Sequence, residues 1–136
     1  KGSDSLHSAL KLYAKADLLI TQNKPTEAIS VLETILETYK TDPIVDQALL
    51  LQAHLYTSEE NYSRAEANYI RIITDFKTDI LVDDAYFYLA ELYRTQLGNT
   101  DKALLNYESI IFNHEDSIHF VEARKQYRFL RGDTIN

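Results

Sequence analysis

The sequence predicts an all-α protein built from helical repeats. The pattern Ala-x-x-x-Leu/Tyr-x-x-Ile-Ile/Leu occurs three times, beginning at Ala28, Ala65 and Ala103, and these alanines are 37 and then 38 residues apart. Similarity at a fixed period of roughly 20 to 50 residues is typical of stacked repeats, in which each unit packs on its neighbours. No segment alternates apolar and polar residues as a half-buried strand would. These observations together predict an α-solenoid.

A second repeated block precedes each alanine block at a fixed offset. Residues 48–56 align with 85–93, and the turn at 41–46 aligns with the turn at 78–83, again 37 residues apart. Each unit is therefore expected to be a helix, a turn and a second helix, and the short connections predict antiparallel neighbours. An earlier copy begins near Ser5 and a last half copy near Ser117. We predict about seven helices: repeats at 5–41, 42–78 and 79–116, and a capping helix at 117–131.

The helices show a buried face and local start and stop signals. Asp42 before Pro43 has the pattern of an N-cap followed by proline at the first helical position. Gly98 follows Leu97, where a left-handed residue would end the fifth helix. The apolar face of one helix has 3,4,3 spacing, which is typical of an amphipathic helix. Its members are Tyr62, Ala65, Tyr69, Ile72, Ile73 and Phe76. Side-chain oxygens at other predicted starts come from Asp79, Ser117 and Asn99–Thr100.

Composition indicates one compact unit, residues 1–136. The chain is 45% hydrophobic, which can supply a core, and three Gly and two Pro leave no linker. It has no cysteine, so neither disulfides nor thiolate metal sites are expected. No apolar run reaches the roughly 18 residues that a membrane span needs. Because the chain lacks methionine and begins at Lys1, we expect a processed form or the C-terminal part of a longer protein.

The net charge of −7 is distributed unevenly. Residues 41–63 hold four acids and no Lys or Arg, and residues 78–93 hold another four acids and no base. Such surfaces repel phosphate backbones and attract basic or polar partners, so nucleic acid is not expected as a ligand. Basic residues gather near the C-terminus, where they form either a solvated face of the last helix or a patch that docks a partner or a further domain. They are Arg124, Lys125, Arg128 and Arg131.

The pattern resembles the tetratricopeptide repeat (TPR) family over almost the whole chain. The small residues of the family's first helix are matched by Ala16, Ala53 and Ala90, ahead of the alanine that opens each second helix. The resemblance implies a right-handed α-solenoid of antiparallel helix pairs that binds proteins. The units of 37 to 38 residues exceed the family's usual length of roughly 34. They resemble the variant found in bacterial cell-envelope proteins, which implies a periplasmic or envelope location, with the cytoplasm as the alternative.

The family's groove positions, carried onto this sequence, predict a partner-binding surface. Their aromatic and aliphatic members are either free for a ligand or packed against neighbouring helices, while the polar members are suited to orient a peptide by hydrogen bonds. The predicted residues are Leu10, Tyr13 and Asp17 in the first repeat, Gln47, Leu50 and His54 in the second, and Asp84, Phe87, Glu91 and Arg94 in the third.

Catalytic and metal motifs are weak in this sequence. His114, Glu115, Asp116, His119 and Glu122 form the best candidate for a divalent metal. Since His114 occupies the repeat position of Phe76 and Tyr39, and His119 that of Leu81, packing is the favoured interpretation. His54 near Glu91 is the one candidate acid–base pair, and it has no nucleophile at a recognisable spacing. We therefore predict no enzyme activity, no metal and no cofactor.

Two functions remain open for such a chain, and the sequence leaves the partner and the oligomeric state undefined. In the first, an acidic concave groove binds a peptide or helix of a basic or polar partner protein. In the second, the chain is the structural end of a longer solenoid and has no ligand of its own.

Overall fold

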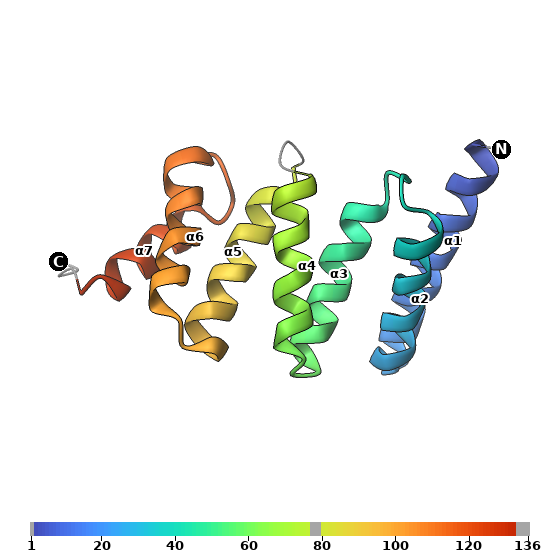
Figure 1. The fold of residues 1–136 in the computed structure, drawn as a ribbon, viewed down its shortest axis with the longest axis horizontal. Helices are drawn as coiled ribbons and strands as arrows, with labels where there is room; N and C mark the ends of the chain where they lie inside the picture. The colour runs from blue at the N-terminus through green and yellow to red at the C-terminus, as the bar shows by residue number, and fades with distance from the viewer. Residues whose placement is uncertain (1, 77–79, 133–136) are drawn as a thin grey trace. The chain divides into compact units, whose positions relative to one another are not determined.

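The computed structural model describes residues 2–76 and 80–132, with side chains from His7 onward, and this part of the chain is all-helical. Seven helices occur there and no strand, which confirms the all-α prediction (Figure 1). They are α1 (Gly2–Thr21), α2 (Pro25–Thr38), α3 (Val45–Ser58), α4 (Tyr62–Asp75), α5 (Val82–Leu92), α6 (Thr100–Asn113) and α7 (Phe120–Leu130), with a π-helical turn, η1 (Tyr93–Leu97), continuing α5.

The chain divides into two compact units, Lys1–Asn68 and Tyr69–Asn136, with the boundary inside α4. In the first unit α1 packs on α2, and α2 packs on α3. In the second, α6 packs on α5 and on α7. Within each unit, neighbouring helices run in opposite directions, as the short connections predicted (Figure 1). The prediction of a single domain spanning 1–136 stays a prediction.

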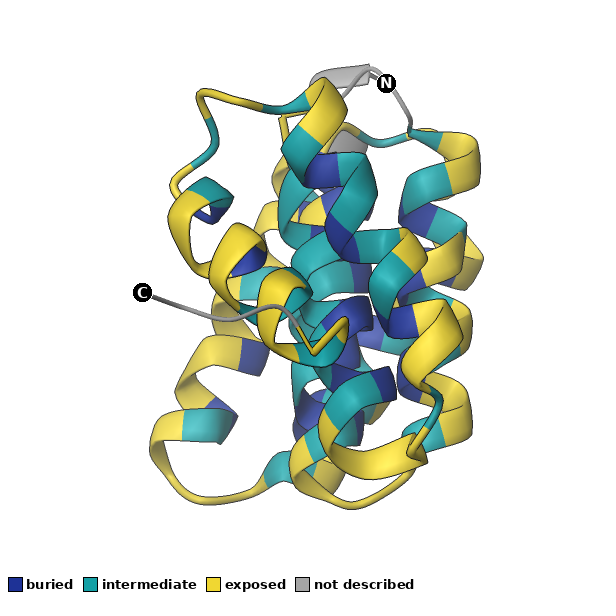
Figure 2. Cartoon of the chain, turned by 90° about the vertical axis from the view of Figure 1, so that its left-hand side faces the viewer, coloured by how far each residue is buried: buried dark blue, intermediate teal, exposed yellow. Residues whose placement is uncertain are grey.

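Small residues let the paired helices approach closely. The repeated alanines Ala16, Ala28, Ala53, Ala90 and Ala103 are all fully buried. Larger apolar side chains fill the space beside them, and in Figure 2 buried and exposed positions alternate along several of the helices. The seam predicted from the alanine spacing is therefore present in both units.

The first unit also contains a buried polar residue, Gln52. Its Nε2 atom donates to the carbonyl oxygen of Ile29 and to Glu33 Oε1, both at 3.1 Å. Its Oε1 atom accepts from Asn68 Nδ2 at 2.8 Å, and the same Nδ2 lies 3.1 Å from the carbonyl oxygen of Leu49. One amide thus links α2, α3 and α4, which satisfies the polar atoms that burial removes from water.

The start signals are partly confirmed. Asn99 caps α6 through a bond from the Lys102 backbone N–H to its Oδ1 atom, as predicted. The prediction for Asp42 was wrong: α3 begins at Val45, and Asp42 Oδ1 instead accepts from the Ile44 N–H in a turn that contains Pro43. Ser117 forms the same kind of turn, accepting from the His119 N–H ahead of α7. Asp79 lies outside the described residues.

The one-residue difference in repeat length has a structural cause. A residue with positive φ ends the first helix of each pair: Asn23, Glu60 and Gly98. Counted from the buried alanine in the first helix of each pair, Gly98 comes one residue later than Asn23 and Glu60 do. The helix-ending bond runs from Lys24 N to Leu19 O and from Asn61 N to Tyr56 O, but from Asn99 N to Tyr93 O. The extra residue therefore lies within η1, because a π turn holds one residue more than an α turn.

Deleting Gln96, an exposed residue of η1, is expected to convert the π turn into an ordinary α-helical end. We expect the free energy of unfolding to stay within about 0.5 kcal/mol of the parent value, as for changes at uncoupled surface sites. The matched control deletes the exposed Ser58 at the end of α3, where no extra residue exists. This control is expected to cost at least about 1 kcal/mol through lost helical bonds. If urea denaturation gave the same loss of unfolding free energy for both deletions, the assignment of the extra residue to η1 would be contradicted.

Candidate protein-binding surface

The predicted groove residues of the third repeat lie on one face of α5 and its continuation. Asp84, Phe87, Glu91 and Arg94 follow 3,4,3 spacing, which places them on the same helical face. All four are half-buried, and each contacts a side chain of its own unit. The face is thus partly occupied by the protein itself.

An aromatic cluster covers the first turns of this face. His119, just before α7, lies with its Nε2 atom 2.6 Å from Asp84 Oδ1. Its ring stacks on Phe87, with centroids 4.3 Å apart and an interplanar angle of 8°. Tyr88 meets the same ring edge-on at 5.6 Å. His119 is buried, so this cluster fastens the start of α7 to α5.

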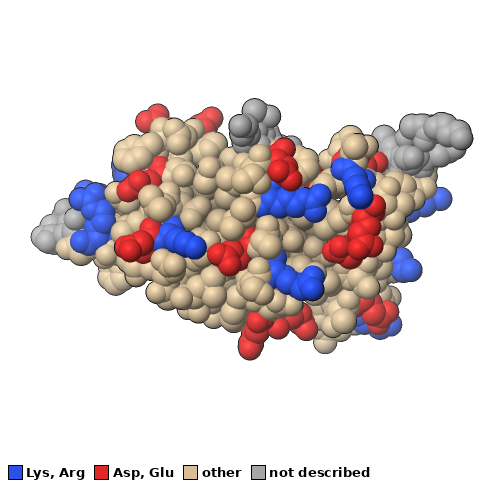
Figure 3. All heavy atoms as spheres, viewed as in Figure 1, with Lys and Arg blue, Asp and Glu red and all other residues tan. Residues whose placement is uncertain are grey.

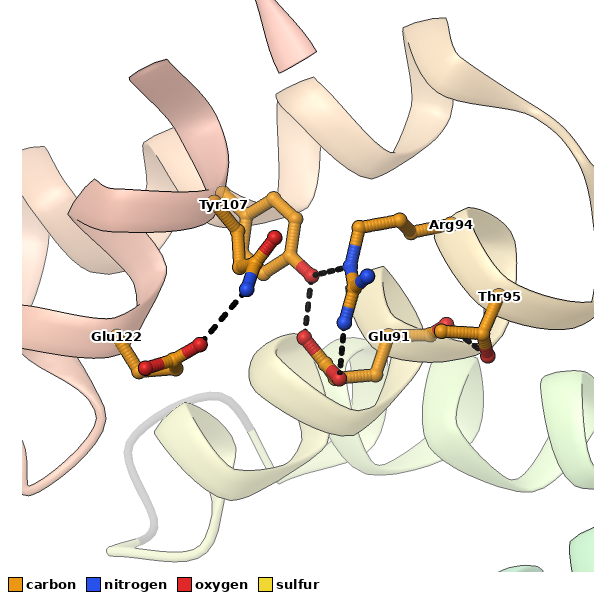
Figure 4. Close-up of polar contacts among 6 residues, drawn as sticks. Glu91, Arg94, Thr95, Tyr107 and Glu122 are labelled. Atoms are coloured by element: carbon orange, nitrogen blue, oxygen red, sulfur yellow. Dashed lines mark hydrogen bonds and ion pairs between the residues drawn. The ribbon is translucent and has the colours of Figure 1, made fainter. Parts of the chain in front are cut away.

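A hydrogen-bonded triad closes the other end of the face, between α5, η1 and α6 (Figure 4). The Tyr107 hydroxyl donates to Glu91 Oε2 at 2.5 Å and accepts from Arg94 Nε at 3.0 Å. Arg94 also forms an ion pair with Glu91 Oε1 at 2.7 Å. Burial, and then the bond to Glu91, raise the pKa of Tyr107. Burial opposes the charged form of Arg94, but the bonds to Tyr107 and Glu91 outweigh it and raise its pKa.

An open pocket lies beside this face, lined by residues of α5 and of the loops that precede α5 and α7. Its volume is about 390 Å³. The lining residues are Ile80, Asp83, Asp84, His114, Asp116, Ser117 and Ile118, so it contains three carboxylates and neither Lys nor Arg. Ile80 and Ile118 occupy the same repeat position and are 87% and 88% exposed. The pocket therefore combines negative charge with exposed aliphatic surface.

The predicted groove residues of the first two repeats lie in the other unit, on α1 and α3. Asp17 and Gln47 are exposed, as is Leu10, and Leu50 and His54 are half-buried. Tyr13 is half-buried, and burial, together with the charges of Asp17 and Asp46, raises the pKa of its hydroxyl. Whether these residues share one surface with those of α5 stays a prediction.

The weak metal candidate gains no support. Within the described part of the chain, no three His, Cys, Asp or Glu side chains are grouped to hold a metal ion. His119 turns to Asp84, and the ring of His114 lies 6.0 Å from that of Tyr86. Both histidines therefore pack within the unit, as their repeat positions indicated.

Three contributors to this surface were missed in the sequence. The repeated pattern includes Tyr107 only as the large residue four positions after Ala103, although its hydroxyl orients Glu91 and Arg94. Ile80 and Ile118 were recognisable as equivalent residues, but their repeat position is Pro43 in the other copy, which suggested only a turn. Their exposure follows from the path of the loops, which the repeat pattern does not define.

Comparison with known families agrees with this geometry. Residues 84–117, which comprise most of α5, all of η1 and α6 and part of the loop that follows, match the family model of the tetratricopeptide repeat. Helices that pack in sequence, with alanines at each seam, define a helical repeat protein. Together with the family match over residues 84–117, they support a helical repeat of the tetratricopeptide type. No curated protein matches the chain. None of the described helices is both long and apolar enough to cross a membrane.

Proposed function

We propose that this protein is a non-enzymatic scaffold that binds a basic segment of a partner protein at the pocket beside α5. Tetratricopeptide repeats in general mediate protein–protein interaction, which supports a protein ligand. The observation on which the proposal depends is the composition of the pocket: Asp83, Asp84 and Asp116 together with Ile80 and Ile118. A cell-envelope location, suggested by repeat length, remains part of the prediction.

The chemistry of the pocket favours an arginine side chain of the partner. A guanidinium group has a planar set of donors that matches carboxylates and retains its charge when partly desolvated. Its aliphatic stem can lie on apolar surface, which Ile80 and Ile118 supply. A volume of about 390 Å³ is at the lower end of the usual range for ligand pockets, so it suits one or two side chains of an extended segment.

A second candidate function is the structural end of a longer repeat array. The occupied face of α5 favours it, because His119 covers Phe87 and Asp84 while Tyr107 engages Glu91. A face filled by its own side chains offers less surface to a ligand. The pocket, which shares only Asp84 with that face, distinguishes the two functions, since a purely structural end has no use for an exposed acidic pocket.

The test is an amide ¹H–¹⁵N NMR titration with the peptide acetyl-Leu-Arg-Leu-amide, using the citrulline peptide as its neutral counterpart. We expect shifts at Asp83, Asp116 and Ile118 with the arginine peptide, and much smaller shifts with citrulline, because the charge is the difference between them. The double variant Asp83→Asn/Asp116→Asn is expected to weaken binding about tenfold, which is about 1.4 kcal/mol.

The matched control for that variant changes exposed acids outside the pocket, Glu37→Gln/Glu115→Gln, and so removes the same net charge. It is expected to bind within about twofold of the parent. If both variants weakened binding equally, the effect would be one of net charge and not of the pocket. If the parent protein did not bind the arginine peptide, the structural-end function would be the better account.

A further inference from the structure

The outward face of α7 differs from the same face of the other first helices. Arg124, Arg128 and Arg131 occupy the repeat positions that are Leu49, Ala53 and Tyr56 in α3, and all three arginines are exposed. The three α3 residues are buried, and so are the α5 residues at the last two positions, Ala90 and Tyr93. Three positions of the helix-pair seam are thus arginines in α7.

The reason for the difference is the second helix of the pair. In α5 the last two of these positions are buried within a unit where α6 packs against it. Among the described residues, α7 packs on α6, through its Ala123 side, and no second helix covers its arginine side. The exposed face of α7 therefore lies at the repeat positions that pack against a second helix elsewhere, but its side chains there are basic instead of apolar.

Apolar residues lie on the same face as the basic ones. Val121 and Phe129 are 69% and 66% exposed, and helical spacing puts Val121 beside Arg124, and Phe129 beside Lys125. We call Val121, Arg124, Lys125, Arg128, Phe129 and Arg131 the basic face of α7. In Figure 3, basic side chains gather at the end of this unit where α7 lies.

Two of the arginines are held by aromatic rings. The guanidinium of Arg124 lies over the ring of Phe120 at 5.3 Å, and that of Arg131 lies over the ring of Tyr127 at 5.1 Å. These contacts limit the side-chain freedom that binding would otherwise have to remove. None of the ion pairs within the described part of the chain involves Arg124, Lys125 or Arg128. Their charges therefore remain uncompensated by a described carboxylate.

We propose that the basic face of α7 docks an acidic amphipathic helix of a partner protein. The face lies where a helix packs in the other repeats, and its charge requires carboxylates on the incoming helix. Val121 and Phe129 provide apolar surface for the leucines of an incoming helix, whose glutamates would pair with the basic residues. A nucleic acid fits less well, because the chain carries a net charge of −7 and the face includes exposed aliphatic surface. This surface is separate from the acidic pocket and selects the opposite charge.

The experiment measures binding of a fluorescent peptide of about 16 residues, in which Glu and Leu recur at helical spacing, by anisotropy with the whole chain. We expect saturable binding that weakens as salt rises, and loss of binding when every Glu of the peptide is replaced by Gln. Arg124→Gln/Arg128→Gln and Phe129→Ser are each expected to weaken binding at least about tenfold without altering helix content, because these side chains are exposed.

Controls separate this surface from others. Lys11→Gln/Lys15→Gln removes two exposed charges from α1 and is expected to leave binding within about twofold. Asp83→Asn/Asp116→Asn, the pocket variant, is also expected not to weaken it, so the two proposals fail independently. Equal binding of the Glu and Gln peptides would overturn the proposal. The proposal would also be overturned if the Glu peptide did not bind to the chain. This holds whether or not an oligothymidine or phosphatidylserine vesicles bound in its place.

Discussion

Replacing Tyr107 with alanine is expected to lower the free energy of unfolding by about 3–5 kcal/mol, the range for truncating a buried aromatic side chain. The ring is fully buried in α6 and meets Phe87 edge-on, with centroids 6.3 Å apart. Its loss also leaves the Glu91–Arg94 pair without the hydroxyl that bridges it. Urea denaturation followed by circular dichroism measures the change.

Two variants divide this effect into its parts. Tyr107→Phe keeps the ring and removes the hydroxyl, so about 1–2 kcal/mol is expected from the lost hydrogen bonds. Leu105→Ala truncates an exposed side chain on the same helix and is expected to stay within about 0.5 kcal/mol. A Tyr107→Ala cost no larger than that of Leu105→Ala would show that the ring does not support the packing of α5 and α6.

Ala53→Leu is expected to destabilise the protein by about 1–3 kcal/mol, because the added isopropyl group has no space in a close-packed seam. Ala53 is fully buried in α3. A larger side chain there forces neighbouring helices apart or its own χ angles away from staggered values. The same denaturation experiment measures the cost.

The control for Ala53 exists within the chain, because Arg128 occupies the same repeat position in α7. Arg128→Leu inserts the same side chain where the described structure has no covering helix, so we expect a change within about 0.5 kcal/mol. If leucine lowered the free energy of unfolding equally at both positions, the inference that this position is covered in α3 and uncovered in α7 would be wrong.

Much of the fold follows from the spacing of small and large residues in the sequence. Ala28, Ala65 and Ala103 recur because each second helix needs a small residue at its closest approach, and all three are fully buried. A steric requirement of this kind leaves a residue-type signal at a fixed period. The local chemistry of Gly98 and Asn99 was equally predictable, since positive φ and an N-cap select particular side chains.

The candidate site was less predictable because its contacts join residues that have no periodic relation. The family positions gave Asp84 and Phe87, but their partner His119 comes from the next repeat and replaces Leu81 of the preceding copy. A single substitution of this kind does not reveal which side chain it will meet. The π turn was hidden for a related reason: the extra residue was visible in the length of the repeat, yet its position was defined only by backbone hydrogen bonds.

Gln52 shows that repeats of one shape are not interchangeable modules. The equivalent residue in the next copy is Leu89, which needs no hydrogen-bond partner, whereas the Gln52 amide bonds to Ile29, Glu33 and Asn68. A chimaera that moved α3 between two other helices would bury this amide without its acceptors and donor, at a cost of about 1–3 kcal/mol. The second repeat is thus matched through this one amide to the helices on either side of it, so its place in the order of the copies matters as well as its shape.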